Sequence, residues 1–436
     1  MRKLAMILLI LSILLPGCRV NQESQKDLPV SAKKQLSPRD YLRDNYTPIN
    51  INSTTDFSDF ALLEKDVLNN TVFLTGEYHS VQLNFPIQTK LLFYLNQKAG
   101  VTRYLAEVPY SVGEYYNLYL KTGDEKLFTY LALEARGTHG EIDDTFTMLK
   151  NIYHYNKELP EEKRIFFLGI DGETVPNVAL SYINMLIKEK PLSIDGLELF
   201  SRILAFIKED GNGFEQGTDE KYKEYVKNLI EHVEDKKEMY KNLLGDDFDS
   251  FMFTIKNLQN GINEMEALKI SAGEFNVVRE GIFKKNFAYW IQKLNQNTKF
   301  FGEWGRDHIF LSELATRDPV NYYSKQIPHL GQILNEEIPR TKGKVISIAY
   351  MYKDSHSYQP HSNIRSAPFE DDFFDIEKLD MFAETDTTLF KLNGKNSPFW
   401  KETLFLDRPI KDGTANYFQY AVLIKNSKAS QAYFKK

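Results

Sequence analysis

Short apolar runs of strand type recur along the chain, and helical stretches separate them. A continuous apolar run followed by an amphipathic helix is typical of a strand buried on both faces of a parallel sheet. Two such helices are indicated over 83–97 and 142–156, where apolar side chains recur at helical spacing. The sequence therefore predicts an α/β fold in which helices flank a mostly parallel central sheet. The apolar runs are 72–74, 104–106, 165–168, 300–301, 345–348 and 417–424.

A carboxylate follows four of these runs at the point where the predicted strand ends, and two of the runs also bring a histidine. Because the carboxyl ends of parallel strands share one edge of a sheet, where ligands bind, we expect these groups to converge. Crowded carboxylates raise one another's pKa, which suits acid–base chemistry. The alternative is that each carboxylate only caps the helix that follows it. The residues are Glu77 and His79, Glu107, Asp171, and Glu303 with Arg306 and His308.

Glu77 and His79 are two positions apart, so in extended backbone their side chains lie on the same face. An imidazole can remove a proton from water while a neighbouring carboxylate orients the ring or stabilises its charge. We therefore expect this pair to activate a water molecule.

The segment from about 190 to 295 lacks strand signals and consists of charged amphipathic stretches. This pattern predicts a large helical insertion between two strands, placed as a lid or wall over the edge of the sheet. Strand signals resume after it and continue toward the C-terminus. We therefore expect a single α/β domain over 46–436 that contains the insertion.

Several stretches, in this order, resemble the erythromycin esterase-like proteins. They are the segment that begins VFLTGEYHS at residue 72, the helix and Gly-x-Asp strand over 141–171, and the helix, strand and His-Ile turn over 277–309. The likeness covers roughly residues 60–350. It implies a metal-independent hydrolase that cleaves an ester or related bond in a small molecule. It also implies site roles, in which His79 activates water, Glu77 and Glu107 position it, His308 assists and Arg306 stabilises an oxyanion. We further expect Asp171, Glu303 and His139 to bind substrate.

Two departures from the esterase pattern support an alternative. One residue separates Glu77 from His79, a spacing closer to the ChaN-like haem-binding lipoproteins, and Glu303-Trp304-Gly305 stands where the esterases carry a further histidine. The alternative is a non-catalytic haem- or ligand-binding lipoprotein of the ChaN-like type.

Three further histidines could belong to the site, and the strand-end residues could instead bind a metal ion. His139 lies in a Gly-flanked loop that reaches the pocket or simply leads into a helix, and His356 and His361 lie in a polar loop. His and Glu side chains at the strand ends are acceptable ligands for Zn or Mn. No His-Glu-x-x-His helix, phosphate-binding Gly-rich loop or Gly-x-Ser-x-Gly elbow is present, so we expect no metal and no serine nucleophile.

The N-terminus resembles a bacterial lipoprotein signal. Residues 1–17 combine a basic start with a short apolar run, and Leu15-Pro16-Gly17-Cys18 resembles a lipobox in which Cys18, the only cysteine, is lipidated. Residues 18–45 read as a flexible tether. Arg19 favours the outer membrane, so we expect an extracytoplasmic protein attached to a membrane only through Cys18.

The amino-acid composition limits which classes of molecule the protein is expected to bind. A net charge of −6 argues against a nucleic-acid binder, because phosphate binding needs a surplus of basic side chains. We therefore expect a small molecule as the partner of the strand-end site, and the sequence leaves the oligomeric state open.

Overall fold

The computed structural model describes residues 36–187, 190, 193–210, 219–314, 328–406 and 410–434. The predicted signal peptide, Cys18 and the tether up to residue 35 lie outside the described residues. Among the helices that are described, none is both long and apolar enough to cross a bilayer.

The folded unit begins earlier than the predicted boundary at residue 46. Helix α1 (Pro38–Leu42) is capped by Ser37, whose side chain accepts a hydrogen bond from the amide of Asp40. Tyr41 and Leu42 are buried in the main core, and the Tyr41 hydroxyl accepts a hydrogen bond from the amide of Gly394 at 2.8 Å. Residues 38–45 therefore belong to the domain rather than to the tether, because they bury apolar surface.

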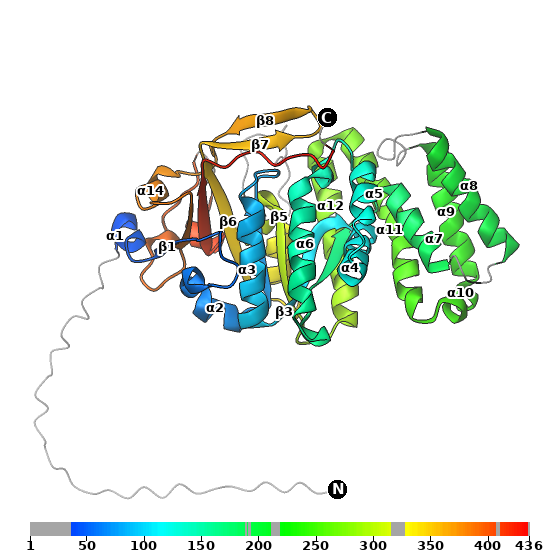
Figure 1. The fold of residues 1–436 in the computed structure, drawn as a ribbon, viewed down its shortest axis with the longest axis horizontal. Coiled ribbons are helices and arrows are strands. Elements are labelled where there is room, and N and C mark those ends of the chain that lie inside the picture. Colours follow the sequence, from blue (N-terminus) through cyan, green and yellow to red (C-terminus); the bar gives the residue numbers. More distant parts are fainter. Residues whose placement is uncertain are drawn as a thin grey trace, which may run out of the picture. The chain divides into compact units, whose positions relative to one another are not determined.

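A mostly parallel sheet of eight strands organises the domain, so the predicted fold class is confirmed (Figure 1). Its strands are β1 (Tyr46–Pro48), β2 (Val72–Glu77), β3 (Val101–Pro109), β4 (Phe166–Asp171), β5 (Lys299–Gly305), β6 (Val345–Lys353), β9 (Thr387–Lys391) and β10 (Tyr420–Lys425). The order across the sheet is β1-β9-β10-β6-β2-β5-β3-β4, in which the pairs β1–β9 and β9–β10 are antiparallel and the other pairs are parallel. A separate hairpin joins β7 (Ser355–Gln359) to β8 (Ile364–Phe369).

Helices cover both faces of the sheet. In Figure 1, α3 (Asn84–Ala99) and α6 (Asp143–Lys157) lie over one face, beside α4 (Tyr110–Thr122). On the other face, α12 (Ala272–Lys293) packs through Phe283 and Phe287 against Trp304 and Phe300 of β5. The remaining helices are α2 (Glu64–Asn69), α5 (Lys126–Glu134), α7 (Pro176–Ile187), α8 (Ile194–Asp210), α9 (Glu220–Asp235), α10 (Lys237–Leu244), α11 (Phe248–Ile270), α13 (Leu330–Glu336) and α14 (Glu377–Asp380).

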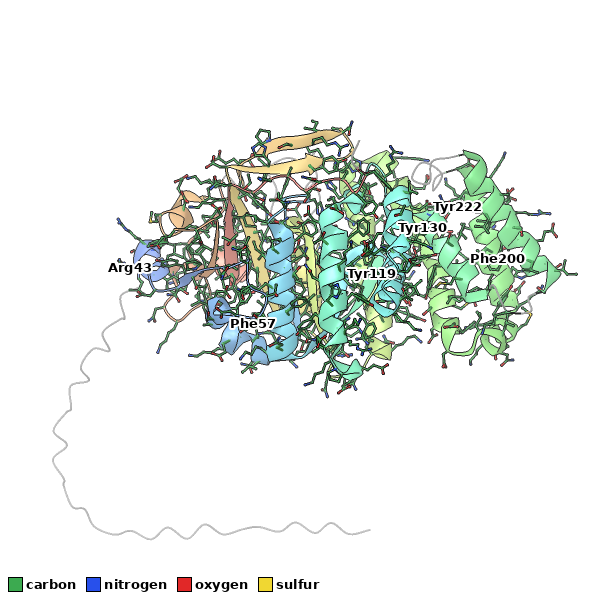
Figure 2. The ribbon with its side chains drawn as sticks, in the orientation of Figure 1. Arg43, Phe57, Tyr119, Tyr130, Phe200 and Tyr222 are labelled. Carbon is green, nitrogen blue, oxygen red and sulfur yellow. The ribbon has the colours of Figure 1, made fainter. Side chains whose placement is uncertain are left out.

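The predicted helical insertion is present between β4 and β5. Its described part consists of α7 to α12, so it starts at Pro176 rather than near residue 190, and it ends at Lys293. Helices α7 to α11 contribute to an apolar core separate from that of the sheet. Phe200 of α8 and Tyr222 of α9 belong to this helical part of the domain (Figure 2).

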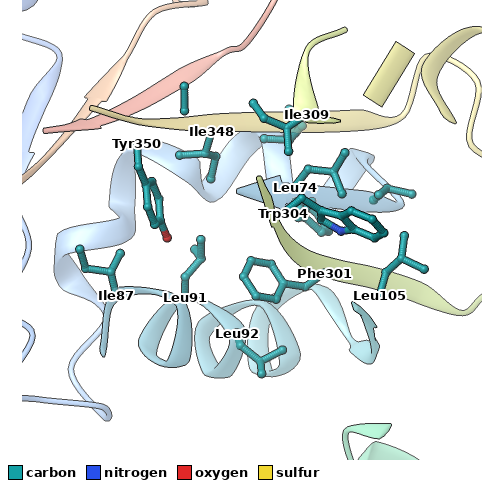
Figure 3. Packing of buried hydrophobic residues seen from close by; sticks show 14 of the residues in the cluster. Leu74, Ile87, Leu91, Leu92, Leu105, Phe301, Trp304, Ile309, Ile348 and Tyr350 are labelled. Atoms are coloured by element: carbon teal, nitrogen blue, oxygen red, sulfur yellow. The ribbon is translucent and has the colours of Figure 1, made fainter. Parts of the chain in front are cut away.

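The main core fixes the ends of the central strands. Leu91 of α3 and Phe301 of β5 lie among its buried side chains, as do Trp304 and Ile309 (Figure 3). Each such side chain contributes about 1.5–3 kcal/mol by leaving water. A Cβ on Gly76 would collide with Ile309, so a glycine on β2 is what allows the turn over 306–309 to approach that strand. This close approach places the His308 turn beside the end of β2.

Candidate functional site

A cavity of about 790 Å³ lies at the carboxyl ends of β2, β3, β4 and β5. One part of its wall is charged and comes from these strand ends, together with Glu264 of α11 and Arg279 of α12. Another part is apolar and comes mainly from α4, α6, α7 and the segments that join them. The apolar side chains include Val112, Tyr116, Leu131, Met148, Val175 and Val178.

Six of the eight predicted pocket residues line this cavity. The other two do not line it: His308 lies behind Glu107, and Arg306 points away from the cavity toward Asp371. The six are Glu77, His79, Glu107, His139, Asp171 and Glu303.

Glu77 and His79 form a hydrogen-bonded pair. Oε1 of Glu77 lies 2.6 Å from Nδ1 of His79, and the His79 side chain is 39% exposed, which leaves its ring accessible from the cavity. Burial opposes the charged imidazole, but the Glu77 carboxylate more than offsets this cost and raises the pKa of His79. The pair therefore has the arrangement of a base and the carboxylate that orients it.

Polar groups from α3 and β6 hold the Glu77 carboxylate in place. The side-chain amide Nδ2 of Asn84, in the first turn of α3, donates to Oε2 of Glu77. The Tyr352 hydroxyl donates to Oδ1 of Asn84 at 3.0 Å and accepts from the amide of Tyr78 at 2.9 Å. These contacts fix Glu77 as an acceptor that faces His79.

Arg279 of α12 joins the carboxylates of two strands. Its Nη1 lies 3.0 Å from Oε1 of Glu107, and its Nε and Nη2 donate to Oδ2 of Asp171 at 3.1 and 2.5 Å. Burial raises the pKa of Glu107, but His308 and Arg279 outweigh it and hold that pKa well below its usual range. Glu107 is therefore an ionised carboxylate between two cations.

His308 is a buried cation behind the cavity wall. Its Nδ1 lies 2.6 Å from Oε1 of Glu280, and its Nε2 lies 3.4 Å from Oε1 of Glu107. Burial opposes the charge, but Glu280 and Glu107 raise the pKa of His308 to about 10. The predicted second histidine therefore acts on the site through Glu107, rather than by direct contact with a ligand.

Arg306 does not line the cavity, which corrects its predicted position in the site. It pairs with Asp371, and its Cζ lies 5.1 Å and 4.9 Å from the ring centroids of Phe373 and Phe374. This pairing turns the guanidinium toward the segment after β8. Arg279 is the guanidinium that lines the cavity.

Three histidines lie together at the cavity wall. The rings of His79 and His139 are 5.0 Å apart between centroids, and His139 and His361 are 5.7 Å apart. A hydrogen bond of 2.6 Å joins Nδ1 of His139 to the Ser80 hydroxyl. Burial and the neighbouring histidines lower the pKa of His139 to about 3, so its ring is neutral at ordinary pH. His356, by contrast, is not among the residues that line the cavity.

Two carboxyl groups in the wall have raised pKa values. Burial and the nearby Glu77 and Glu107 raise the pKa of Glu303 well above its usual range. Burial and Asp171 do the same for Glu264, which accepts a hydrogen bond from the amide of Gly172 at 3.1 Å. Both acids therefore hold a proton to a higher pH than an exposed carboxyl group does.

Arg279, Glu280 and Glu264 were not predicted as site residues, because all three lie on helices rather than at strand ends. The adjacent opposite charges at 279 and 280 on one helix are the signal that could have identified the first two. Across the described ranges, no group of three or more His, Cys, Asp or Glu side chains is arranged to hold a metal ion.

Comparison of sequences identifies no relative: no family model matches the chain, and no curated protein matches it. Comparison of structures does identify several. A Bacillus cereus protein matches with TM-score 0.66 and 17% identity over 91% of this chain and 98% of that chain. A succinoglycan biosynthesis protein matches with TM-score 0.66 and 16% identity over the same shares.

A mutant of the erythromycin esterase EreC in its open conformation matches with TM-score 0.65 and 15% identity. The match covers 90% of this chain and 100% of that chain. A haem-binding ChaN of Campylobacter jejuni aligns with TM-score 0.27, which carries no argument about this fold. The three neighbours that align over at least nine-tenths of both chains are differently named proteins, so they establish architecture and not a reaction. The chain therefore has the fold of the erythromycin esterases.

Proposed function

We propose that this protein is a hydrolase that cleaves an ester or related bond in a small molecule, with water activated at His79. The observation that carries the proposal is the 2.6 Å hydrogen bond between Glu77 and His79 in the wall of a cavity at the strand ends. A base held by a carboxylate and exposed to a ligand cavity is the arrangement that water activation requires.

The residues divide the work as follows. Glu77 holds Nδ1 of His79, which leaves Nε2 to take a proton from water as the water oxygen attacks the carbonyl carbon. Arg279, anchored by Asp171 and Glu107, supplies positive charge to the cavity wall where the oxyanion develops. His308 keeps Glu107 ionised and so keeps Arg279 in place. None of these roles needs a metal or another cofactor.

The fold neighbours are compatible with this chemistry. One of them is an erythromycin esterase, and this shared architecture supports the proposal. The apolar part of the wall fits a small molecule with an apolar body beside the bond that is cleaved.

The test is a panel of carboxylic esters assayed with and without EDTA. We expect turnover that EDTA does not reduce, and we expect His79→Ala to lower kcat by about 10²–10⁴-fold, the usual contribution of a general base. His154→Ala is the matched control, because His154 is exposed on α6 and outside the cavity. Equal turnover in wild type and His79→Ala contradicts the proposal. A haem absorbance band that disappears in His79→Ala, without esterase activity, favours the haem-binding alternative instead.

We also propose that Cys18 carries a lipid and tethers the domain outside the cytoplasm. The support is the lipobox-like sequence that ends at this cysteine. Metabolic labelling with palmitate should mark the wild type and not Cys18→Ala, and the variant should move from the membrane to the soluble fraction. Unchanged fractionation with no label contradicts the proposal.

A further inference from the structure

Glu303 is a buried acid that the mechanism above leaves unused, although it lines the cavity beside the Glu77–His79 pair. We propose that Glu303 is the general acid of the site and gives its proton to the leaving alcohol. This inference rests on the proposed hydrolase function and assigns the second proton transfer that the reaction needs.

The register of two neighbouring strands places Glu303 next to Glu77. In the parallel pair β2–β5, Glu303 is opposite Thr75 and Glu77 is opposite Gly305. Residues opposite each other in a parallel pair, and residues two apart along a strand, have their side chains on the same face. Glu303 and Glu77 therefore lie on one face of the sheet, and both reach the cavity.

The hydrogen bonds of Glu77 show which of the two acids holds a proton. Glu77 and Glu303 lie on the same face of neighbouring strands, and the negative charge of Glu77 raises the pKa of Glu303, so one of the two carboxyl groups takes up a proton first. Glu77 already accepts from Asn84 and lies 2.6 Å from Nδ1 of His79, so it is the ionised partner. The proton therefore belongs to Glu303.

The surroundings of Glu303 keep it neutral. The titratable groups that face it are Glu77 on β2, Tyr104 and Glu107 on β3, and Tyr350 and Tyr352 on β6. None of these groups is a cation, so nothing among them stabilises a second negative charge. Glu107 is the contrasting strand-end acid, because cations on both sides keep it ionised.

One oxygen of Glu303 has no partner among the described residues. Its Oε2 is buried and makes no hydrogen bond in the part of the chain that the structure describes. A buried polar atom without a partner costs about 1–3 kcal/mol, so a rotation that turns this oxygen toward the cavity that Glu303 lines gives up no hydrogen bond to the described residues. An ester oxygen of the substrate would supply the missing partner.

The proton transfers form a closed cycle. Water gives a proton to Nε2 of His79 while its oxygen bonds to the carbonyl carbon. The bond from that carbon to the leaving oxygen then breaks, and this oxygen takes the proton of Glu303. The proton on Nδ1 of His79 passes through Glu77 to Glu303, which leaves His79 as its Nε2–H tautomer. Exchange with solvent water, in which one proton leaves Nε2 and one returns to Nδ1, then restores the starting state. One ester and one water give one acid and one alcohol.

Leaving-group dependence tests the proposal. An alkyl ester needs a proton on its departing oxygen, whereas a p-nitrophenyl ester does not. Glu303→Gln should lower kcat for the alkyl ester by about 10²–10⁴-fold and change it little for the p-nitrophenyl ester. Glu173→Gln is the matched control, because Glu173 is a buried acid with its pKa raised to about 7 that does not line the cavity. Equal effects of Glu303→Gln on both esters overturn the assignment.

Two measurements keep the test decisive if a variant folds poorly. In the wild type, the alkyl ester should show a loss of kcat at high pH that the p-nitrophenyl ester lacks, and identical profiles overturn the proposal. Infrared difference spectra at neutral pH should show a protonated carboxyl band that Glu303→Gln removes, and an unchanged band overturns it too. If the wild type hydrolyses no ester, the proposed function fails, while the infrared band still reports whether Glu303 holds a proton.

Discussion

Nδ1 of His308 lies 2.6 Å from Oε1 of Glu280, deep behind the wall of the cavity. Both side chains are almost fully buried, so this ion pair has little solvent to screen it. It joins α12 to the turn that follows β5. Through Glu107, the same histidine affects the charged wall of the cavity.

His308 should make stability depend on pH in the alkaline range. Its pKa in the folded protein is about 10, above the value of about 6.5 for an unfolded chain. Its contribution is therefore complete below about pH 6.5 and is lost as pH rises toward 10. Urea denaturation at a series of pH values should show this fall, and His308→Gln should reduce it. A variant with the same alkaline slope as wild type contradicts the assignment.

Arg279→Lys should lower both stability and activity. Lysine cannot reproduce the planar fork that contacts Asp171 while reaching Glu107. Removing a partner from a buried ion pair costs about 3–5 kcal/mol, and lysine should cost part of this. Thermal melts and kcat on the best ester of the panel measure the two effects. Arg306→Lys is the comparison, and it should lower stability while leaving kcat of the folded protein unchanged.

Glu77→Gln should move the acid limb of the pH–rate profile to lower pH. Burial alone lowers the pKa of His79, and the Glu77 carboxylate is what raises it. Without that negative charge, His79 stays neutral at a lower pH and becomes a weaker base. The profile of kcat/KM from pH 4 to 9 checks this prediction, with His154→Ala as the control. An acid limb that stays at the wild-type position would show that another group sets it.

Gly305→Ala should reduce turnover more than it reduces stability. A Cβ at this position would lie 3.2 Å from Nε2 of His79 and 3.5 Å from Cδ2 of His308. The backbone angles at Gly305, φ −49° and ψ 134°, suit alanine as well as glycine, so the backbone should keep its conformation. The added methyl group would instead displace the His79 ring, because it would lie too close to it. Gly281→Ala is the control, because nothing lies within 4 Å of its Cβ position on α12. Kinetics and thermal melts of both variants measure the difference, and wild-type kcat in Gly305→Ala contradicts the prediction.

The central strands, and the charged residues that follow them, could be predicted from the sequence. Runs such as 72–74 and 345–348 are apolar because both faces of their strands are covered, and this pattern is visible without a structure. The antiparallel strands β1 and β9 escaped prediction, since β1 has three residues and the apolar signal of β9 is broken by threonines. Burial of Tyr41 likewise depends on contacts with residues near 394 and 399, which sequence order does not reveal.

The charged wall of the cavity was only partly predictable. Glu77, Glu107, Asp171 and Glu303 could be identified because a parallel sheet brings strand ends together. Arg279 could not, because its place depends on how α12 packs against the sheet over a long sequence separation. The sequence also did not show which arginine lines the cavity. Asp371, a loop residue, pairs with Arg306 and holds it away from the cavity that Arg279 lines.

Helix α11 links the two cores of the domain. It has 23 residues and so extends over about 35 Å, from buried positions in the helical insertion to Glu264 and Met265 in the cavity wall. A substitution that tilts this helix from its far end would widen or narrow the cavity without touching His79 or Glu77. The insertion is thus a region in which substitutions would change the size of the cavity and leave the contacts of His79 and Glu77 unaltered.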